Sequence, residues 1–146
     1  DPNKSRGVIL MSKNQPEYQI HKTVCEYLRW KYPTVLFLTD LDNQIKLTQG
    51  QAKRNKALQH DKFKCPDLII FAPSVQHHGL FIEFKAKSPY KIDGVTLLKN
   101  EHIEAQWQSI LDLRLRGYAA DFAWTVEMAI QQIDNYMKRA TGVWKV

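Results

Sequence analysis

The chain has 146 residues, of which 44% are hydrophobic and 25% charged, and its formal net charge is +6. This length and composition are typical of one soluble globular domain with a full hydrophobic core. No apolar run is long enough to cross a membrane, and the N-terminus lacks the pattern of a secretory signal. Two cysteines, Cys25 and Cys65, are too few for a disulfide framework. We therefore expect a cytoplasmic protein with no membrane partner.

The first ten residues show no periodic pattern, whereas Met11 and the following SKNQPE resemble a natural start. We therefore expect residues 1–10 to be an expression leftover or a disordered segment that takes no part in the fold. Residues 11–146 contain no internal repeat, no low-complexity stretch and no second-domain signal. They are predicted to form a single domain.

Residues 17–31 are predicted to form a helix, because apolar side chains recur at helical spacing from Ile20 to Leu28. Extending this apolar stripe backwards reaches Glu17, where a buried carboxylate would need a partner. Alternatively, Glu17 complements the helix dipole from the first turn while its side chain points to water, and the pattern alone favours this role. The β-branched and apolar segment 34–39 then predicts a buried strand.

A long polar segment, Gln44 to Lys64, follows this strand and carries most of the net positive charge, with six basic residues against one acid over residues 46–64. The basic residues are Lys46, Lys53, Arg54, Lys56, Lys62 and Lys64. Such a cluster suggests a polyanionic partner, but it would also suit a loop that lysines keep solvated, and the sequence does not separate the two. A short helix at Gln51–Leu58 fits the pattern, and no glycine-rich phosphate-binding motif is present.

Two short apolar runs, Leu68–Phe71 and Leu80–Phe84, are separated by a turn-like segment and predict a β-hairpin. Asp67 precedes the first run, and Glu83 and Lys85 close the second. Adjacent strands of a hairpin lie about 4.8 Å apart, so two acids at corresponding levels can share one cation. Carboxylates are the ligands that magnesium prefers in proteins.

Side chains of the second run alternate, so Phe81, Glu83 and Lys85 point to the face opposite its purely apolar one. Such a face is often exposed to solvent in antiparallel sheets, but the presence of Phe81 argues against that interpretation. A divalent cation on this face would acidify water and clamp phosphate oxygens, and Lys85 could offset charge on a phosphate. The backbone carbonyl of Phe84 is a further candidate ligand. On its own, the Asp-x15-Glu-x-Lys spacing recurs by chance in many chains.

The second half of the chain predicts a helix over residues 100–116, with Asn100 as its N-cap and Gly117 as its C-terminal stop. A strand over 118–124 and a helix from its cap, Thr125, to about Met137 follow. Gln106 borders the buried face of the first of these helices. It is either a buried amide that needs partners or, as is more common, an amide at the stripe edge in water. Strands that alternate with helices in this way indicate an α/β fold in which helices cover both faces of a mixed sheet.

The runs PDLIIF and GLFIEFK together resemble the PD-(D/E)xK nuclease superfamily, and more closely its VRR-NUC branch, which includes stand-alone proteins of phages and prophages. PEYQIHKTVCEYL is similar to the opening helix of that branch with its acid, and HIEAQWQSILDLRLRGY to a later helix with a glutamine. The similarity spans roughly Glu17 to Tyr136. The chain departs from the pattern in its long basic insert before Cys65 and in lacking a glycine just before Pro66. These two departures bear on the local contacts with substrate and not on the metal site.

The resemblance implies a restriction-endonuclease-like core, ordered αβββαβ with a C-terminal helix. It also implies a Mg²⁺- or Mn²⁺-dependent endodeoxyribonuclease that cuts branched DNA such as Holliday junctions, works as a homodimer and uses no small-molecule cofactor. The implied catalytic residues are Asp67, Glu83, Lys85, Glu17 and Gln106, with Asp67, Glu83, Glu17 and the Phe84 carbonyl as metal ligands. DNA would contact the basic residues named above and Lys87.

Two other functions also fit the sequence. A non-catalytic protein that binds branched DNA would rely on the basic segment, although the intact set of Asp67, Glu83 and Lys85 argues against decay of a catalytic site. A sequence-specific type II restriction endonuclease would need an element that reads the major groove, for which only residues 44–64 are available. The five histidines are assigned no role. Cys65 lacks partners at zinc-site spacing, and Cys25 is expected to be a small core residue.

Overall fold

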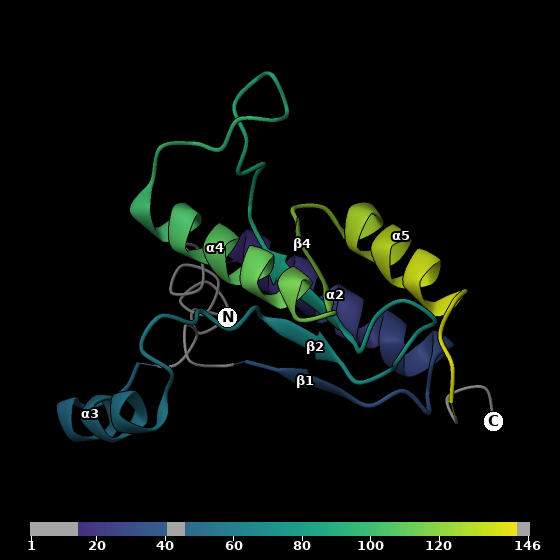
Figure 1. Ribbon diagram of the computed structural model, residues 1–146, viewed down its shortest axis with the longest axis horizontal. Helices are drawn as coiled ribbons and strands as arrows, with labels where there is room; N and C mark the ends of the chain where they lie inside the picture. The colour runs from purple at the N-terminus through teal and green to yellow at the C-terminus, as the bar shows by residue number, and fades with distance from the viewer. Residues whose placement is uncertain (1–14, 41–45, 143–146) are drawn as a thin grey trace, which may run out of the picture.

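A four-stranded mixed sheet organises the chain (Figure 1). The computed structural model describes residues 15–40 and 46–142, so the expected expression leftover or disordered segment at 1–10 lies outside the described residues. The strands, which lie side by side in chain order, are β1 (Phe37–Thr39), β2 (Leu68–Ile70), β3 (Leu80–Phe84) and β4 (Ala119–Ala123). The β1–β2 and β2–β3 pairs are antiparallel, and β3 runs parallel to β4. The predicted hairpin is therefore confirmed as β2 and β3.

Four helices accompany the sheet in the described part of the chain: α2 (Gln15–Lys31), α3 (Gln49–Leu58), α4 (Glu101–Leu115) and α5 (Val126–Met137). The predicted caps are present. Asn100 accepts hydrogen bonds from two backbone N–H groups of α4, and Thr125 accepts one from α5. Gly117 ends α4 with a φ of 89°, a conformation that favours glycine. None of these helices is both long and apolar enough to cross a membrane.

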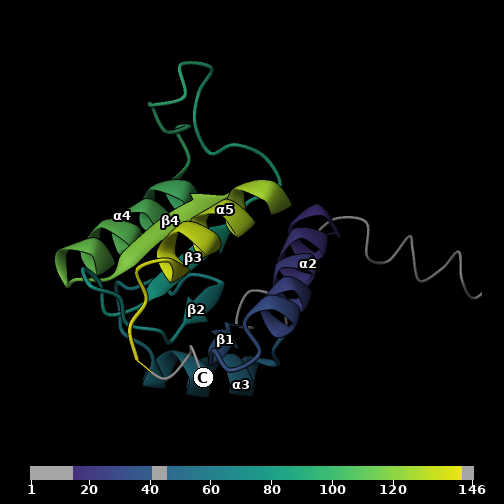
Figure 2. The ribbon, with the colours of Figure 1, turned by 90° about the vertical axis from the view of Figure 1, so that its right-hand side faces the viewer.

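Two hydrophobic cores sandwich the sheet, with α2 and α5 on one face and α4 on the other (Figure 2). The predicted mixed sheet with helices on both faces is thus confirmed. The side chains of β3 alternate between these two cores. Leu80, Ile82 and Phe84 join the first, and Phe81 packs against the second. Glu83, on the Phe81 side of the strand, is only 4% exposed. The interpretation that this face of β3 is exposed to solvent is therefore wrong.

The segment predicted as a buried strand over residues 34–39 is shorter and more exposed than expected. Only Phe37–Thr39 forms β1, and it is the edge strand of the sheet. The Leu36 and Leu38 side chains remain 73% and 55% exposed. Apolar composition marked a strand correctly, but α4 packs on β4 and leaves one side of this edge strand uncovered, whereas Phe37 packs against the first core on the other side.

The basic segment before β2 contains the expected short helix, α3. Its start is fixed by a capping box, in which the Thr48 hydroxyl accepts from the Gln51 N–H and the Gln51 side chain accepts from the Thr48 N–H. No residue of α3 is buried, and the helix stands apart from the rest of the fold (Figure 1). It therefore contributes surface rather than core.

Candidate active site

Asp67 and Glu83 face each other at one end of the β2–β3 hairpin. Leu68 pairs with Ile82, so the antiparallel register continues to Asp67 opposite Glu83. The Asp67 carboxylate accepts a hydrogen bond of 2.9 Å from the backbone N–H of Phe84. The hairpin ladder thus ends in a side chain-to-backbone bond that fixes the Asp67 carboxylate beside β3.

The two carboxyl groups compete for ionisation. Burial and the negative charges of Asp67 and Glu17 together raise the pKa of Glu83 to about 9, although the positive charge of Lys85 lowers it. Burial, together with the charge of Glu17, raises the pKa of Asp67 to about 6. A hydrogen bond joins the two carboxyl groups. The pair therefore retains a proton near neutral pH, as two buried carboxylates in contact must without a cation.

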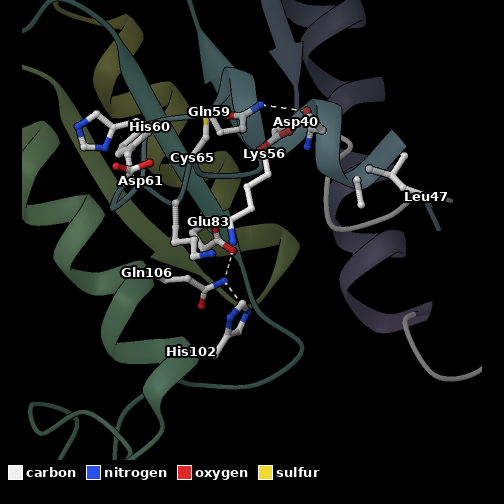
Figure 3. A pocket seen from close by; sticks show the side chains of 14 residues that line it. Asp40, Leu47, Lys56, Gln59, His60, Asp61, Cys65, Glu83, His102 and Gln106 are labelled. Carbon is white, nitrogen blue, oxygen red and sulfur yellow. Dashed lines mark hydrogen bonds between the residues drawn. The ribbon is translucent and has the colours of Figure 1, made fainter. Parts of the chain in front are cut away.

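Gln106 braces this pair from α4. Its Nε2 donates a hydrogen bond of 2.6 Å to Glu83 Oε1 and lies 3.1 Å from His102 Nε2 (Figure 3). Gln106 is only 5% exposed. Its amide is therefore buried and does not point to water, although a glutamine at the edge of an apolar stripe more commonly does. Burial and the positive charges of Lys85 and Lys64 lower the pKa of His102, which favours a neutral ring that accepts the Gln106 N–H.

Sequence reasoning gave no role to His102, although the structure joins it to the Gln106–Glu83 contact. The available signal was its spacing. His102 lies four residues before Gln106 on the same helix, and residues at that spacing are neighbours on a helix surface. A polar pair at this spacing beside an apolar stripe indicates a shared polar site.

Helix α2 brings Glu17 to the pair. One turn after Glu17, the His21 ring packs against Phe84 with ring centroids 4.7 Å apart, and its Nε2 lies 3.2 Å from Thr39 Oγ1. These contacts hold the first turn of α2 against the sheet. Glu17 is half-buried rather than fully solvated. Its charge acts on the Asp67–Glu83 pair, as described above.

Lys85 and the Phe84 carbonyl complete the set predicted from the sequence. The Lys85 N–H bonds to the carbonyl of Ala123 on β4 at 2.9 Å, which fixes the backbone just after Glu83. The N–H and C=O of one strand residue point to the same side, and the Phe84 N–H points at Asp67. The Phe84 carbonyl therefore opens toward the same edge as the Asp67 carboxylate.

A pocket of about 510 Å³ opens beside Glu83, between α3 and α4 (Figure 3). Glu83, His102 and Gln106 line one side. The other side is lined by α3 and the segment that follows it, including Lys56 and Lys64. The Lys56 side chain extends toward Glu83 in Figure 3. A 2.8 Å bond from the Lys64 N–H to the Ser109 hydroxyl ties this segment to α4.

The structure thus separates the basic residues named from the sequence into two groups. Lys56 and Lys64 line the pocket. The remaining ones are exposed and lie outside its lining: Lys46, Lys53, Arg54, Lys62 and Lys87.

The donor atoms suit a hard divalent cation. Magnesium in proteins commonly takes one or two carboxylates and completes its shell with water and substrate oxygens. A cation between Asp67 and Glu83 would replace their shared proton and relieve their repulsion. Gln106 Oε1 is buried without a hydrogen-bond partner in the described structure, which leaves an oxygen acceptor for an incoming donor. Among residues 15–40 and 46–142, no three His, Cys, Asp or Glu side chains form a ready-made metal cage.

The fold has a counterpart among solved structures. A chain described as "VRR_NUC domain protein" superposes with a TM-score of 0.57, covering 84% of this chain and 88% of its own length at 24% sequence identity. The chain has the fold of a VRR_NUC domain protein. The α/β class and the VRR_NUC resemblance stated from the sequence are thereby confirmed at the level of the fold. No family model and no curated protein matches the sequence.

Within this VRR_NUC fold, the site residues named from the sequence come from separate elements. The β2–β3 hairpin supplies Asp67, Glu83 and Lys85, α2 supplies Glu17, and α4 supplies Gln106. Their convergence rests on the hydrogen bonds and charge effects described above.

Proposed function

We propose that the protein is a Mg²⁺- or Mn²⁺-dependent DNA endonuclease that hydrolyses phosphodiester bonds in branched DNA. The supporting observation is the buried Asp67–Glu83 pair, which keeps a proton that a divalent cation would displace. Lys85 lies two residues after Glu83, and a pocket with lysines on its far wall opens beside the pair. Acidic groups that can bind a metal, beside a pocket lined by lysines, suit a polyanionic substrate.

In this proposal each residue of the site has a distinct task. Asp67, Glu83 and Glu17 hold the cation, which supplies an acidified water and neutralises phosphate charge when bound. Gln106 fixes the Glu83 carboxylate through its 2.6 Å bond, and His102 accepts the other Gln106 N–H. The Lys85 ammonium stabilises the negative charge that develops on the phosphate.

Cleavage of synthetic DNA tests this function. With magnesium, the purified protein is expected to cut flap, fork or four-way junction DNA, and a chelator should stop it. A four-way junction should be cut on two opposing strands, because we propose that a two-fold homodimer presents two equivalent sites. Binding without cleavage in either metal would favour the non-catalytic DNA-binding alternative. Cutting of plain duplex at one sequence would favour a restriction endonuclease.

The basic helix α3 gives a separate prediction. Reversing Lys53, Arg54 and Lys56 to glutamate should weaken DNA binding at least about tenfold near physiological salt and flatten its salt dependence, because fewer counterions are released. The triple variant Arg29→Glu, Lys138→Glu and Arg139→Glu is a control with the same change in net charge at exposed positions elsewhere. Fluorescence anisotropy over a salt series measures both effects.

Metal binding should be the same in the α3 variant, the control and wild type, because these side chains are exposed and none is proposed as a ligand. Unchanged affinity of the α3 variant for branched DNA would show that this helix is only a solvated surface. An equal loss in the control would indicate a general charge effect instead of a local contact.

A further inference from the structure

A narrow finger, residues 88–99, projects from the fold between β3 and α4 (Figures 1 and 2). Its two sides pair through backbone hydrogen bonds from the Lys91 N–H to Thr96 O at 2.7 Å and from the Leu98 N–H to Pro89 O at 2.9 Å. The bridge between Tyr90 and Leu97 joins the same two sides. The finger is thus a short hydrogen-bonded hairpin.

The turn at the end of the finger is held by its own side chains. The Asp93 carboxylate accepts 2.9 Å bonds from the backbone N–H groups of Val95 and Thr96, and a 2.6 Å bond from the Thr96 hydroxyl. Gly94 has a φ of 71°, which allows the chain to reverse at this point. The tip therefore has a defined shape that does not depend on contacts with the rest of the protein.

The base and the tip of the finger differ in burial. At the base, Tyr90 packs edge-on against Trp124 and Phe122, with ring centroids 5.8 and 6.4 Å apart. At the tip, the Ile92 and Val95 side chains are 108% and 79% exposed. Apolar side chains in water contribute nothing to the hydrophobic stabilisation of the fold. Both residues are β-branched and therefore stiff, which suits them to insertion into a partner.

Both ends of the finger lead into the candidate active site. The finger begins three residues after Lys85 and ends at Asn100, the N-cap of the helix that carries Gln106. Lys87, at its base, and Lys91, on its side, are exposed. In Figures 1 and 2 the finger rises on the side of the fold opposite to α3. DNA held at the pocket would therefore lie between two exposed basic elements.

We propose that the finger is a wedge that inserts Ile92 and Val95 between bases at the branch point of DNA, so that the protein selects branched over continuous DNA. This inference rests on the proposed nuclease function and names the element that recognises its branched substrate. Apolar wedges between base steps unstack the duplex, which costs less where a branch has already interrupted stacking. Lysines beside the tip contact the flanking phosphates.

The double variant Ile92→Ser/Val95→Ser tests the wedge. Cleavage of branched DNA should fall about tenfold or more, whereas cleavage of continuous duplex should stay within about twofold, because only the branched substrate uses the tip. The control, Leu36→Ser/Leu115→Ser, changes two other exposed apolar residues and should behave as wild type. The turn bonds involve Asp93 and backbone groups, so the fold of the finger is retained.

A second readout does not depend on cleavage. With chelator present, the fluorescence of 2-aminopurine placed at the branch point should increase when wild-type protein binds and unstacks this base. It should not increase when the tip variant binds. If the wild type increases the fluorescence of the probe but never cleaves the DNA, the nuclease proposal fails and the wedge stands. If the tip variant keeps the wild-type selectivity and the wild-type rise in fluorescence, the wedge is overturned.

Discussion

Asp67→Asn is expected to abolish metal-dependent DNA cleavage, with a loss of rate of roughly a thousandfold or more. The substitution removes the negative charge but keeps an oxygen that can accept the 2.9 Å bond from the Phe84 N–H. It also removes a charge that raises the pKa of Glu83, so the metal-free fold should not be weakened. The loss would therefore come from the metal site and not from misfolding.

Lys85→Met should act on the same reaction in a different way. Methionine keeps an unbranched apolar stem but removes the ammonium, and the rate should fall about a hundredfold or more. Because the positive charge of Lys85 lowers the pKa of Glu83, its loss should raise that pKa further and weaken cation binding at neutral pH. Raising the pH should then recover cation binding without recovering the rate.

Single-turnover cleavage of one branched substrate, with thermal melting of each variant, measures both predictions. Glu104→Gln and Lys138→Met are matched controls, since both residues are exposed and away from the pair. Cleavage at near wild-type rates by the Asp67 variant, under conditions where the wild type requires magnesium, would remove Asp67 from the site.

Local sequence patterns predicted those features of this site that depend on neighbours along the chain or across one turn. The alternation of β3 placed Glu83 on the Phe81 side of the strand, and the hairpin placed Asp67 opposite it, as the register confirms. Capping at Asn100 and Thr125 set the helix starts for the same reason. Each of these features is decided by local geometry.

Features that depend on distant elements did not follow from the pattern. Glu83 is buried because α4, nearly twenty residues later, packs over its face of the sheet, and periodicity cannot report that contact. Gln106 and His102 sat at the edge of an apolar stripe, where buried and solvated positions have the same spacing. The exposure of Leu38 has the same origin, since composition marks a strand but tertiary packing decides which strand lies at the edge.

Glu83→Gln is expected to stabilise the metal-free protein while it abolishes stabilisation by metal. The folded protein holds a proton on Glu83 up to a pKa of about 9, whereas the unfolded chain releases it near the ordinary value of 4.5. Unfolding therefore releases a proton between these two values, and the free energy of unfolding falls as pH rises through that range. Glutamine cannot ionise, so the variant escapes this loss.

The difference between variant and wild type should grow from pH 5 to pH 9 and reach about 2 kcal/mol or more at pH 8. The variant amide also has a ready partner. Gln106 Oε1 is buried without a hydrogen bond in the described structure, and it would accept an N–H from the amide at position 83 after a rotation of the Gln106 amide. A neutral amide would then stand where the wild type has the carboxyl group that faces Asp67.

Metal should act in the opposite direction on the wild type. A cation displaces the shared proton of Asp67 and Glu83, so Mg²⁺ or Mn²⁺ should raise the melting temperature more at pH 8 than at pH 6, where protons compete better. The variant should show little rise at either pH, because one of its two facing carboxylates is gone. Glu104→Gln, on the exposed face of α4, should follow the wild type.

Melting curves from pH 6 to pH 9, each with chelator and with Mn²⁺, separate these effects. If the carboxyl pair is kept for metal binding at a cost to the fold, the Glu83 variant melts higher than wild type in chelator and loses the manganese response. If wild type and variant melt together at every pH and respond equally to manganese, the carboxyl pair holds no cation.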